Sequence, residues 1–136
     1  MFDCLIYGDD LAVGVEYFLP ECASHTELHL TSRDLMQLYN VRNNYDLTIL
    51  SLSYNDINID TEYNLRNVRE KINGKVIWLL SDNYLDQYYD TIAVANEFGD
   101  SILFTTNYDH DFKTKLPTLK GFQKLKNDIV YLNSRL

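Results

Sequence analysis

Residues 45–80 read YDLTILSLSYNDINIDTEYNLRNVREKINGKVIWLL, and this stretch decides the fold. Residues 45–52 are rich in β-branched and apolar side chains and predict a strand. Residues 61–72 place apolar side chains at helical spacing and end at Asn73-Gly74, a typical helix stop. Residues 75–80, KVIWLL, are the most apolar run of the chain and predict a second strand. A strand, a helix and a strand in this order predict a right-handed crossover within a parallel sheet.

The same alternation continues on both sides of this stretch. Apolar or alternating runs predict three more strands, and the amphipathic runs between them predict helices. Nearly continuous apolar strands are expected when helices cover both faces of a parallel sheet. We therefore expect one domain, residues 1–136, with an α/β fold: a three-layer α/β/α sandwich around a five-stranded parallel sheet, flavodoxin-like in order. The further predicted strands are residues 3–7, 27–30 and 101–105, and the further predicted helices are residues 11–19, 31 or 32 to 41, 85–98 and 119–132.

Charge and hydropathy exclude several classes of partner. The chain has 12 basic and 20 acidic residues, a formal net charge of −8. Such an acidic chain is poorly suited to nucleic-acid phosphate or to an anionic membrane, so we expect no nucleic-acid partner and no membrane partner. No apolar run approaches the roughly 20 residues that span a bilayer, and the first residues lack the pattern of a signal peptide. We expect a cytoplasmic or virion location.

The two cysteines, Cys4 and Cys22, have neither the number nor the spacing of a disulfide framework or a zinc site. Cys4 lies in an apolar run and is predicted to be a small core side chain. Cys22 follows Pro20 in a predicted loop. We therefore predict that the cysteines are not paired, that the chain matures in a reducing compartment, and that it uses no metal and no other cofactor.

Short motifs occur in the loops at the predicted carboxyl edge of the sheet, where ligands bind in such folds. Residues 8–14, GDDLAVG, follow the first predicted strand, and residues 53–56, SYND, follow the third. Residues 116–122, LPTLKGF, lead into the last predicted helix. In order and spacing, these motifs resemble the conserved blocks of the SGNH, or GDSL-type, hydrolases over nearly all of the chain. Residues 30–35, LTSRDL, resemble the entry to the second block of that family, without its glycine.

The departures from the family pattern fall on its catalytic residues. In the family, a serine of the first block is the nucleophile, and an aspartate and a histidine of the last block activate it. The resemblance places Asp10, Lys113 and Leu116 at these three positions. Asn55 remains as a side-chain donor of the family's oxyanion hole, but a carboxylate at position 10 would repel a developing oxyanion. The resemblance therefore implies a degenerate member without the catalytic triad.

Another histidine of the chain could replace the missing catalytic histidine. His110 lies six residues before Leu116 in the same predicted loop and could turn back towards Asp10; the alternative is an exposed loop histidine. His25 and His29 are four residues apart and share one face if residues 27–30 form a strand. No third ligand accompanies them, so we predict no metal site there.

Three hypotheses for the function follow. The first is a catalytically inactive SGNH-hydrolase-like module that serves as a binding or structural subunit; 11 Tyr and 13 Asn suggest a viral particle component such as a capsid or tail protein. The second is an esterase or acetylhydrolase with a rearranged site of Asp10, Asn55 and His110. The third is a receiver-like switch with Asp9 and Asp10 as its acid pair, although the third predicted strand lacks the aspartate that such a switch phosphorylates.

Other side chains are assigned to binding or to the fold. Tyr84, Tyr88 and Tyr89 crowd one predicted helix, and tyrosine is enriched at protein interfaces. We predict that this helix contacts a protein partner or a second copy of the chain. Asp9 and Asp56 are predicted to hold their loops in place and to take no part in chemistry.

Overall fold

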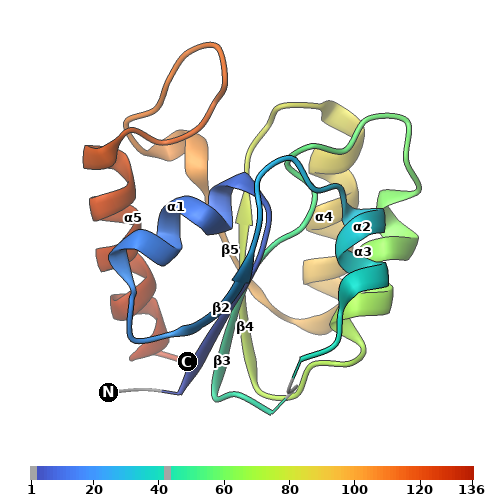
Figure 1. Ribbon diagram of the computed structural model, residues 1–136, viewed down its shortest axis with the longest axis horizontal. Helices are drawn as coiled ribbons and strands as arrows, with labels where there is room; N and C mark the ends of the chain where they lie inside the picture. Colours follow the sequence, from blue (N-terminus) through green and yellow to red (C-terminus); the bar gives the residue numbers. More distant parts are fainter. Residues whose placement is uncertain (1–2, 42–43) are drawn as a thin grey trace.

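The computed structural model describes residues 3–41 and 44–136. The predicted α/β fold class is confirmed: five parallel strands form one sheet, and helices cover both of its faces (Figure 1). The strands are β1 (Cys4–Gly8), β2 (Ala23–Thr26), β3 (Leu47–Ser51), β4 (Lys75–Leu80) and β5 (Ser101–Phe104); the helices are α1 (Asp10–Phe18), α2 (Ser32–Leu38), α3 (Thr61–Arg69), α4 (Leu85–Phe98) and α5 (Leu119–Asn133), with a short 3₁₀ helix, η1 (Thr105–Asn107).

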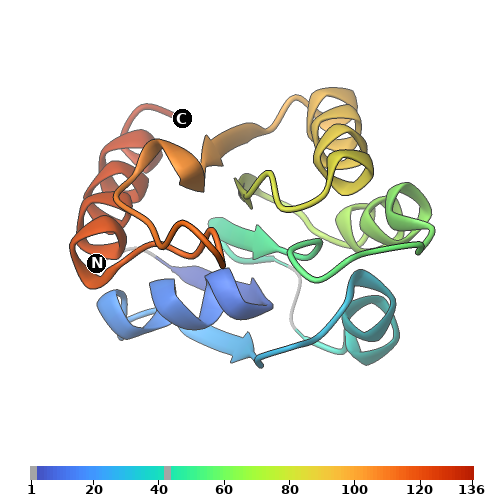
Figure 2. The ribbon, with the colours of Figure 1, turned by 90° about the horizontal axis from the view of Figure 1, so that it is seen from above.

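The helices divide into two layers. Figure 2 shows α1 and α5 on one face of the sheet and α2, α3 and α4 on the other. Side chains of a strand alternate between the two faces. In β1, Cys4 and Ile6 therefore join the core beneath α1 and α5, whereas Leu5 and Tyr7 join the core beneath α2, α3 and α4. Two apolar cores, one on each face, hold the sheet between the helix layers.

The strand order is β2-β1-β3-β4-β5, which places a topological switch point between β1 and β3. The chain leaves β1 towards one side of the sheet and leaves β3 towards the other, so a crevice opens between their two loops. The backbones of the strands meet closely there, because a Cβ atom on Gly8 would lie 1.9 Å from the carbonyl oxygen of Ser51. Gly8 also has a φ of 152°, which glycine adopts readily.

The second predicted strand is wrong in position. The sequence pattern favoured residues 27–30, but β2 covers Ala23–Thr26 and pairs with β1 from Leu5↔Ala23 to Gly8↔Thr26. β2 is an edge strand of four half-buried or exposed residues, ASHT, and therefore lacks the apolar signature of a buried strand. The shift moves residues 27–30 out of the sheet and into the loop at its carboxyl edge.

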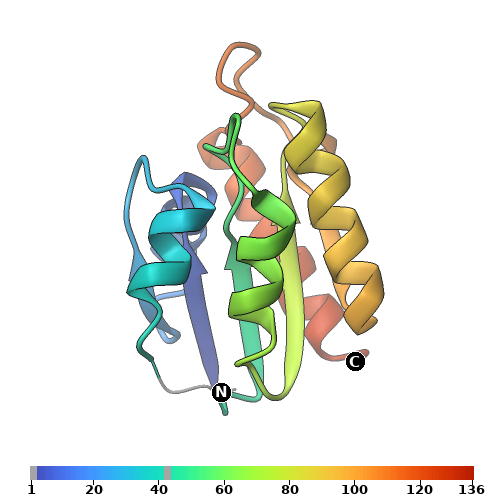
Figure 3. The ribbon, with the colours of Figure 1, turned by 90° about the vertical axis from the view of Figure 1, so that its right-hand side faces the viewer.

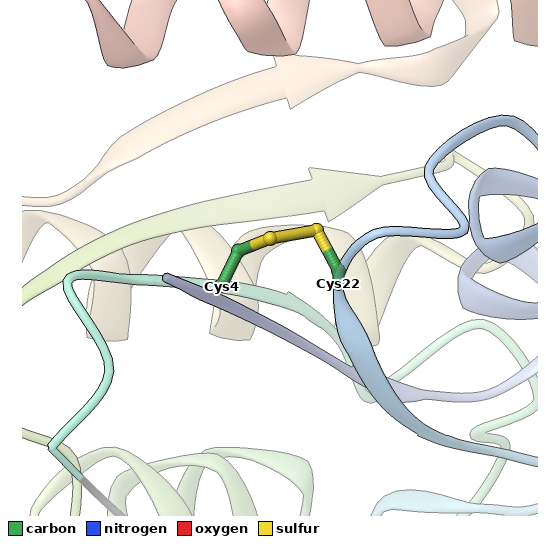
Figure 4. Close-up of a disulfide and its surroundings, with 2 residues drawn as sticks. All are labelled: Cys4 and Cys22. Atoms are coloured by element: carbon green, nitrogen blue, oxygen red, sulfur yellow. A yellow bond between two sulfur atoms is a disulfide. The ribbon is translucent and has the colours of Figure 1, made fainter. Parts of the chain in front are cut away.

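A disulfide joins Cys4 to Cys22 (Figure 4), so the prediction that the cysteines are not paired is wrong. The parallel register explains the bond. Because Leu5 lies opposite Ala23, the preceding residues Cys4 and Cys22 also lie side by side, with their Cα atoms 4.9 Å apart. This separation is within the range that a disulfide spans. The disulfide therefore fastens the edge strand β2 to β1.

The structure bears on two predictions about location. Disulfides form and persist mainly in oxidising environments, so the prediction of a reducing compartment loses its basis. Within residues 3–41 and 44–136, no helix combines the length and the apolar character needed to cross a membrane.

Removal of the disulfide is expected to destabilise the domain. It closes a chain segment with a sequence separation of 18 residues, and the double change Cys4→Ala and Cys22→Ala should lower the free energy of unfolding by about 3 kcal/mol. For a chain of this length, that loss corresponds to a fall in Tm of roughly 10 °C in a thermal melt. Thiol titration of the denatured, unreduced wild type should detect no free thiol. Two free thiols per chain, or an unchanged Tm in the variant, would contradict the pairing.

Candidate functional site

Three loops meet at the carboxyl edge of the sheet, and their side chains and backbone form one hydrogen-bonded cluster around Asp10. Asp10 is the first residue of α1, His29 lies in the loop after β2, and Asn55 lies in the loop after β3. The Asp10 side chain is buried, with 8% of its surface exposed. We call Asp10, His29 and Asn55 the Asp10 cluster. It lies beside the switch point, where ligands bind in open α/β sheets.

One oxygen of Asp10 accepts two hydrogen bonds from different loops. Asp10 Oδ1 lies 2.9 Å from the backbone nitrogen of His29 and 2.8 Å from Nδ2 of Asn55. A backbone N–H and a side-chain amide that converge on one oxygen are the donors that stabilise an oxyanion during acyl transfer. In this chain, an oxygen of its own carboxyl group accepts from both donors.

The Asn55 side-chain amide uses both of its hydrogens within the fold. Nδ2 lies 2.8 Å from Asp10 Oδ1 and also 2.8 Å from the carbonyl oxygen of Leu30. A side-chain amide nitrogen has two hydrogens to donate. A ligand oxygen could therefore be bound by Asn55 only if one of these two acceptors were displaced.

His29 is the functional candidate that the sequence pattern missed. The prediction of a strand over residues 27–30 placed it in the sheet with His25, whereas only His25 lies in a strand, opposite Tyr7. His29 has a φ of 69°, a left-handed conformation in which glycine is common. The imidazole is 86% exposed, and its Nδ1 lies 3.8 Å from Asp10 Oδ2.

The predicted rescue by His110 finds no support in the geometry. The Nδ1 of His110 is 2.7 Å from the carbonyl oxygen of Tyr108, and His110 pairs with Pro117 in an isolated antiparallel bridge. Among the described residues, no ion pair or hydrogen bond joins His110 to Asp10; the imidazole beside Asp10 is that of His29. The loop from residue 108 to 118 folds back on itself and so keeps the His110 ring with its own backbone.

Lys113 and Leu116, which the resemblance places at the other two catalytic positions, lie in the same loop. The backbone nitrogen of Lys113 donates to Asp111 Oδ2 at 3.0 Å, and its side chain is exposed. Leu116 is half-buried and packs against the core beneath α1 and α5. An aliphatic side chain at that position cannot transfer a proton.

Asp9 has a structural role, as predicted. Its carboxyl group is fully buried and joins the end of β1 to the end of β3: Oδ1 accepts from Ser51 Oγ at 2.6 Å, and Oδ2 accepts from the backbone nitrogen of Tyr54 at 2.9 Å. Oδ1 also accepts from the backbone nitrogen of Leu11, at 3.3 Å, as the N-cap of α1. Both oxygens are occupied within the fold, which leaves the receiver-like hypothesis without one carboxylate of its acid pair.

Burial raises the pKa of Asp9 to about 8, although the hydrogen bonds from Ser51, Tyr54 and Leu11 oppose the shift. The nearby Asp10 carboxyl group adds a smaller increase. A buried carboxyl group without a cationic partner is expected to hold its proton in this way. The proton of Asp9 limits the negative charge at the end of β1, directly below Asp10.

Asp56 braces the neighbouring loop, which is also as predicted. It is buried, and its Oδ1 accepts from the backbone nitrogen of Ser32 at 2.8 Å. Its Oδ2 accepts from the hydroxyl groups of Ser32 and Thr61, the latter at 2.7 Å. Asp56 thereby fixes the loop after β3 to the first residues of α2 and α3, and so holds Asn55 in position.

A polar depression of about 390 Å³ opens beside the Asp10 cluster. Its floor is held by two hydrogen bonds: the Tyr54 hydroxyl donates to the carbonyl oxygen of Thr114, and Asn83 Nδ2 donates to the carbonyl oxygen of Tyr54 at 3.3 Å. The depression could accept a small polar ligand, since it offers ammonium, amide and hydroxyl groups. The residues that line it are Tyr54, Asn55, Asn83, Tyr84, Lys113, Thr114 and Lys115.

The three tyrosines of the predicted binding helix differ in exposure. Tyr84 is 43% exposed immediately before α4, and Tyr89 is 63% exposed. Tyr88 is half-buried and packs edge-on against Tyr89, with the ring of Phe104 6.0 Å away. Tyr84 and Tyr89 are therefore the exposed members of the set, whereas Tyr88 packs against Tyr89.

No protein-family model and no curated protein matches the sequence. Solved structures do match in fold. A GDSL-like lipase from Bacteroides thetaiotaomicron superposes with a TM-score of 0.68 and 12% identity, over 98% of this chain and 88% of that one. A carbohydrate acetylesterase family member from Sinorhizobium meliloti superposes with a TM-score of 0.62 and 9% identity, over 100% of both chains. The fold is therefore SGNH-hydrolase-like, as the order of the motifs predicts.

The raised pKa of Asp9 predicts a pH dependence of stability. Between the unfolded pKa, 3.8, and the folded pKa, about 8, the folded state binds one proton more than the unfolded chain. The contribution of Asp9 is therefore complete below the unfolded pKa and is lost as the pH rises through 8. Over this window the free energy of unfolding should fall by about 1.4 kcal/mol per pH unit.

The variant Asp9→Asn isolates this effect. Its amide oxygen can accept from Tyr54 while its nitrogen donates to Ser51 Oγ, so the variant is expected to fold. Urea denaturation between about pH 5 and pH 8 should show a smaller loss of stability in Asp9→Asn than in the wild type. Parallel curves for the two proteins would contradict a protonated Asp9.

Proposed function

We propose that this domain is an SGNH-hydrolase-like binding or structural module that does not hydrolyse esters through a catalytic triad. The observation that carries the proposal is the position of Asp10 Oδ1, which accepts hydrogen bonds from His29 N–H and Asn55 Nδ2. These are the two donors best placed to stabilise an oxyanion.

An ester carbonyl would have to compete with Asp10 for these donors. Loss of one oxyanion-hole donor typically costs about 2.7–4 kcal/mol of transition-state stabilisation. In this chain both donors are engaged, and the group that engages them is a carboxyl group, which as an anion repels a second negative charge. Lys113 and Leu116, at the two remaining triad positions, cannot serve as the family's aspartate and histidine.

A role as a binding module fits the surface and the composition. Tyr84, the N-cap of α4, and Tyr89, within α4, are exposed, and a protein partner could reach them. The content of 11 Tyr and 13 Asn supports a subunit of a larger assembly, for which a viral particle is our proposed setting. Folds are reused in this way when the site changes but the scaffold does not.

A second candidate function is an esterase with a rearranged site, and one observation favours it: the imidazole of His29 lies next to Asp10, with 3.8 Å between Nδ1 and Oδ2. In that mechanism the Asp10 carboxylate would attack the ester carbon while a protonated His29 gives its proton to the departing alkoxide, leaving the alcohol, an acyl-aspartyl anhydride and a neutral His29. His29 would then take a proton from the water that hydrolyses the anhydride. The lipase and acetylesterase with the same fold also support this candidate.

An ester panel separates the two functions. We expect the purified wild type to hydrolyse p-nitrophenyl acetate and acetylated sugars no faster than buffer. The variants Asp10→Ala and His29→Ala are the tests, and Asp82→Ala, which removes an exposed carboxylate of the same edge, is the matched control. Turnover by the wild type and by Asp82→Ala that is lost in Asp10→Ala and His29→Ala would refute the inactive module and establish the rearranged esterase.

A further inference from the structure

Charge is unevenly distributed along this acidic chain. Residues 112–126 contain five of its 12 basic residues and no Asp or Glu, although the chain has 20 acidic residues in total. Part of this basic stretch lies in the loop from residue 108 to 118, which rises above the carboxyl edge of the sheet (Figures 1 and 3). We call Phe112, Lys113 and Lys115 of this loop the basic arm.

The basic arm presents an aromatic side chain on an ordered loop. Phe112 is 85% exposed, the highest exposure among the large apolar side chains described, and Lys115 Nζ lies 5.7 Å from its ring centre. The loop is braced internally: the backbone nitrogen of Asp111 donates to the carbonyl oxygen of Leu116 at 2.8 Å, and the Asp111 carboxylate accepts from the backbone nitrogen of Thr114 at 2.8 Å. Little conformational entropy would therefore be lost when such a loop docks.

A groove between the loop after β3 and the start of α4 could accept such an aromatic side chain. It has a volume of about 410 Å³, and exposed apolar side chains line it: Leu85 is 68% exposed, Ile57 56% and Tyr84 43%. A cavity of about 150 Å³ already accommodates benzene, so this groove has room for a phenyl ring. We define the α4 groove by six of its lining residues, Ile57, Asn58, Ile59, Tyr84, Leu85 and Asp86.

Carboxylates surround the α4 groove. Asp86 lies in its wall, and Asp60, Glu62 and Asp90 lie on the adjoining turns of α3 and α4. Burial, and after it the neighbouring carboxylates Glu62, Asp86 and Asp60, raise the pKa of Asp90. The groove therefore combines an apolar surface with a negative potential and suits an aromatic side chain flanked by cations.

We propose that the basic arm of one chain docks in the α4 groove of a second copy, and that two chains exchange this contact around a two-fold axis. The proposal names the partner of the binding module and thus rests on the proposed function. The loop of the arm and the segments that line the groove lie at the same end of the sheet, the loop next to α5 and the groove segments at the start of α3 and α4 (Figure 1). When two molecules meet end to end, one two-fold rotation places each arm over the groove of the other copy.

The size of a stable interface favours the reciprocal arrangement over a single contact. A stable interface buries about 800 Å² per partner, whereas one aromatic side chain buries about 150–250 Å². Two arms in two grooves, together with the surface between them, approach the required area. The dimer would also cover the depression beside the Asp10 cluster, since Lys113 and Lys115 of the arm and Tyr84 of the groove line that depression.

Light scattering coupled to size-exclusion chromatography tests the dimer directly. At about 100 μM, a concentration that populates even weak dimers, the wild type should have twice the chain mass of 16.0 kDa. Phe112→Ser, Lys113→Glu and Asp86→Lys should each weaken dimerisation at least tenfold, because each removes the apolar anchor or reverses one charge. Tyr17→Ser, which removes another strongly exposed aromatic side chain, on α1, is the matched control and should remain dimeric.

Charge reversal on both sides of the contact is the most decisive test of the dimer. Lys113→Glu and Asp86→Lys should each form less dimer than the wild type when alone, but a mixture of the two should regain it as a heterodimer, because both reciprocal contacts then pair opposite charges. A monomeric wild type, a dimer that Phe112→Ser leaves intact, or a mixture that stays monomeric would each overturn the proposal. Circular dichroism of each variant verifies that it folds. The ester panel is also run on Phe112→Ser, in which the site would not be covered by a second chain, so failure of the dimer and failure of the proposed function give separate results.

Discussion

The buried carboxyl group of Asp9 fixes the geometry on which the site depends. It accepts a hydrogen bond from the Ser51 hydroxyl at the end of β3 and another from the backbone of Tyr54 in the following loop. These bonds hold the loop after β1 against the loop after β3 across the switch point. Asp10 and Asn55, the next residues along the two loops, are thereby brought within 2.8 Å of each other.

In the proposed function, this fixed geometry allows the site to change while the fold stays the same. A carboxyl group at position 10 is close enough to accept from both His29 N–H and Asn55, so the donors have an acceptor inside the protein. Buried donors that are already satisfied contribute to stability. In the proposed function, the same bonds that hold the three loops together would oppose the entry of a substrate carbonyl, and other surfaces of the scaffold would bind partners.

The fold could be predicted well where strands are buried and helices have clear ends. The predicted residues 75–80 and 85–98 coincide with β4 and α4, because KVIWLL is apolar after its first residue and Gly99 ends the helix in a left-handed conformation. The edge strand β2 could not be predicted, since its sequence ASHT carries no apolar pattern. The disulfide was missed for a related reason: the pairing of Cys4 with Cys22 follows from the register of β1 and β2, which the sequence alone does not reveal. The misplaced strand also hid His29, whereas Asp10 and Asn55 were found because their motifs are local.

The central claim is that Asp10 occupies the donors His29 N–H and Asn55 Nδ2, and NMR spectroscopy of the two donors tests it most directly. In Asp10→Ala, the proton and nitrogen resonances of both groups should shift, and added acetate should return them towards their wild-type positions by supplying a carboxylate in place of the lost one. Acetate should leave both resonances of the wild-type protein unchanged. Donor resonances that do not respond to the loss of Asp10, or that respond to acetate equally in both proteins, would contradict the claim.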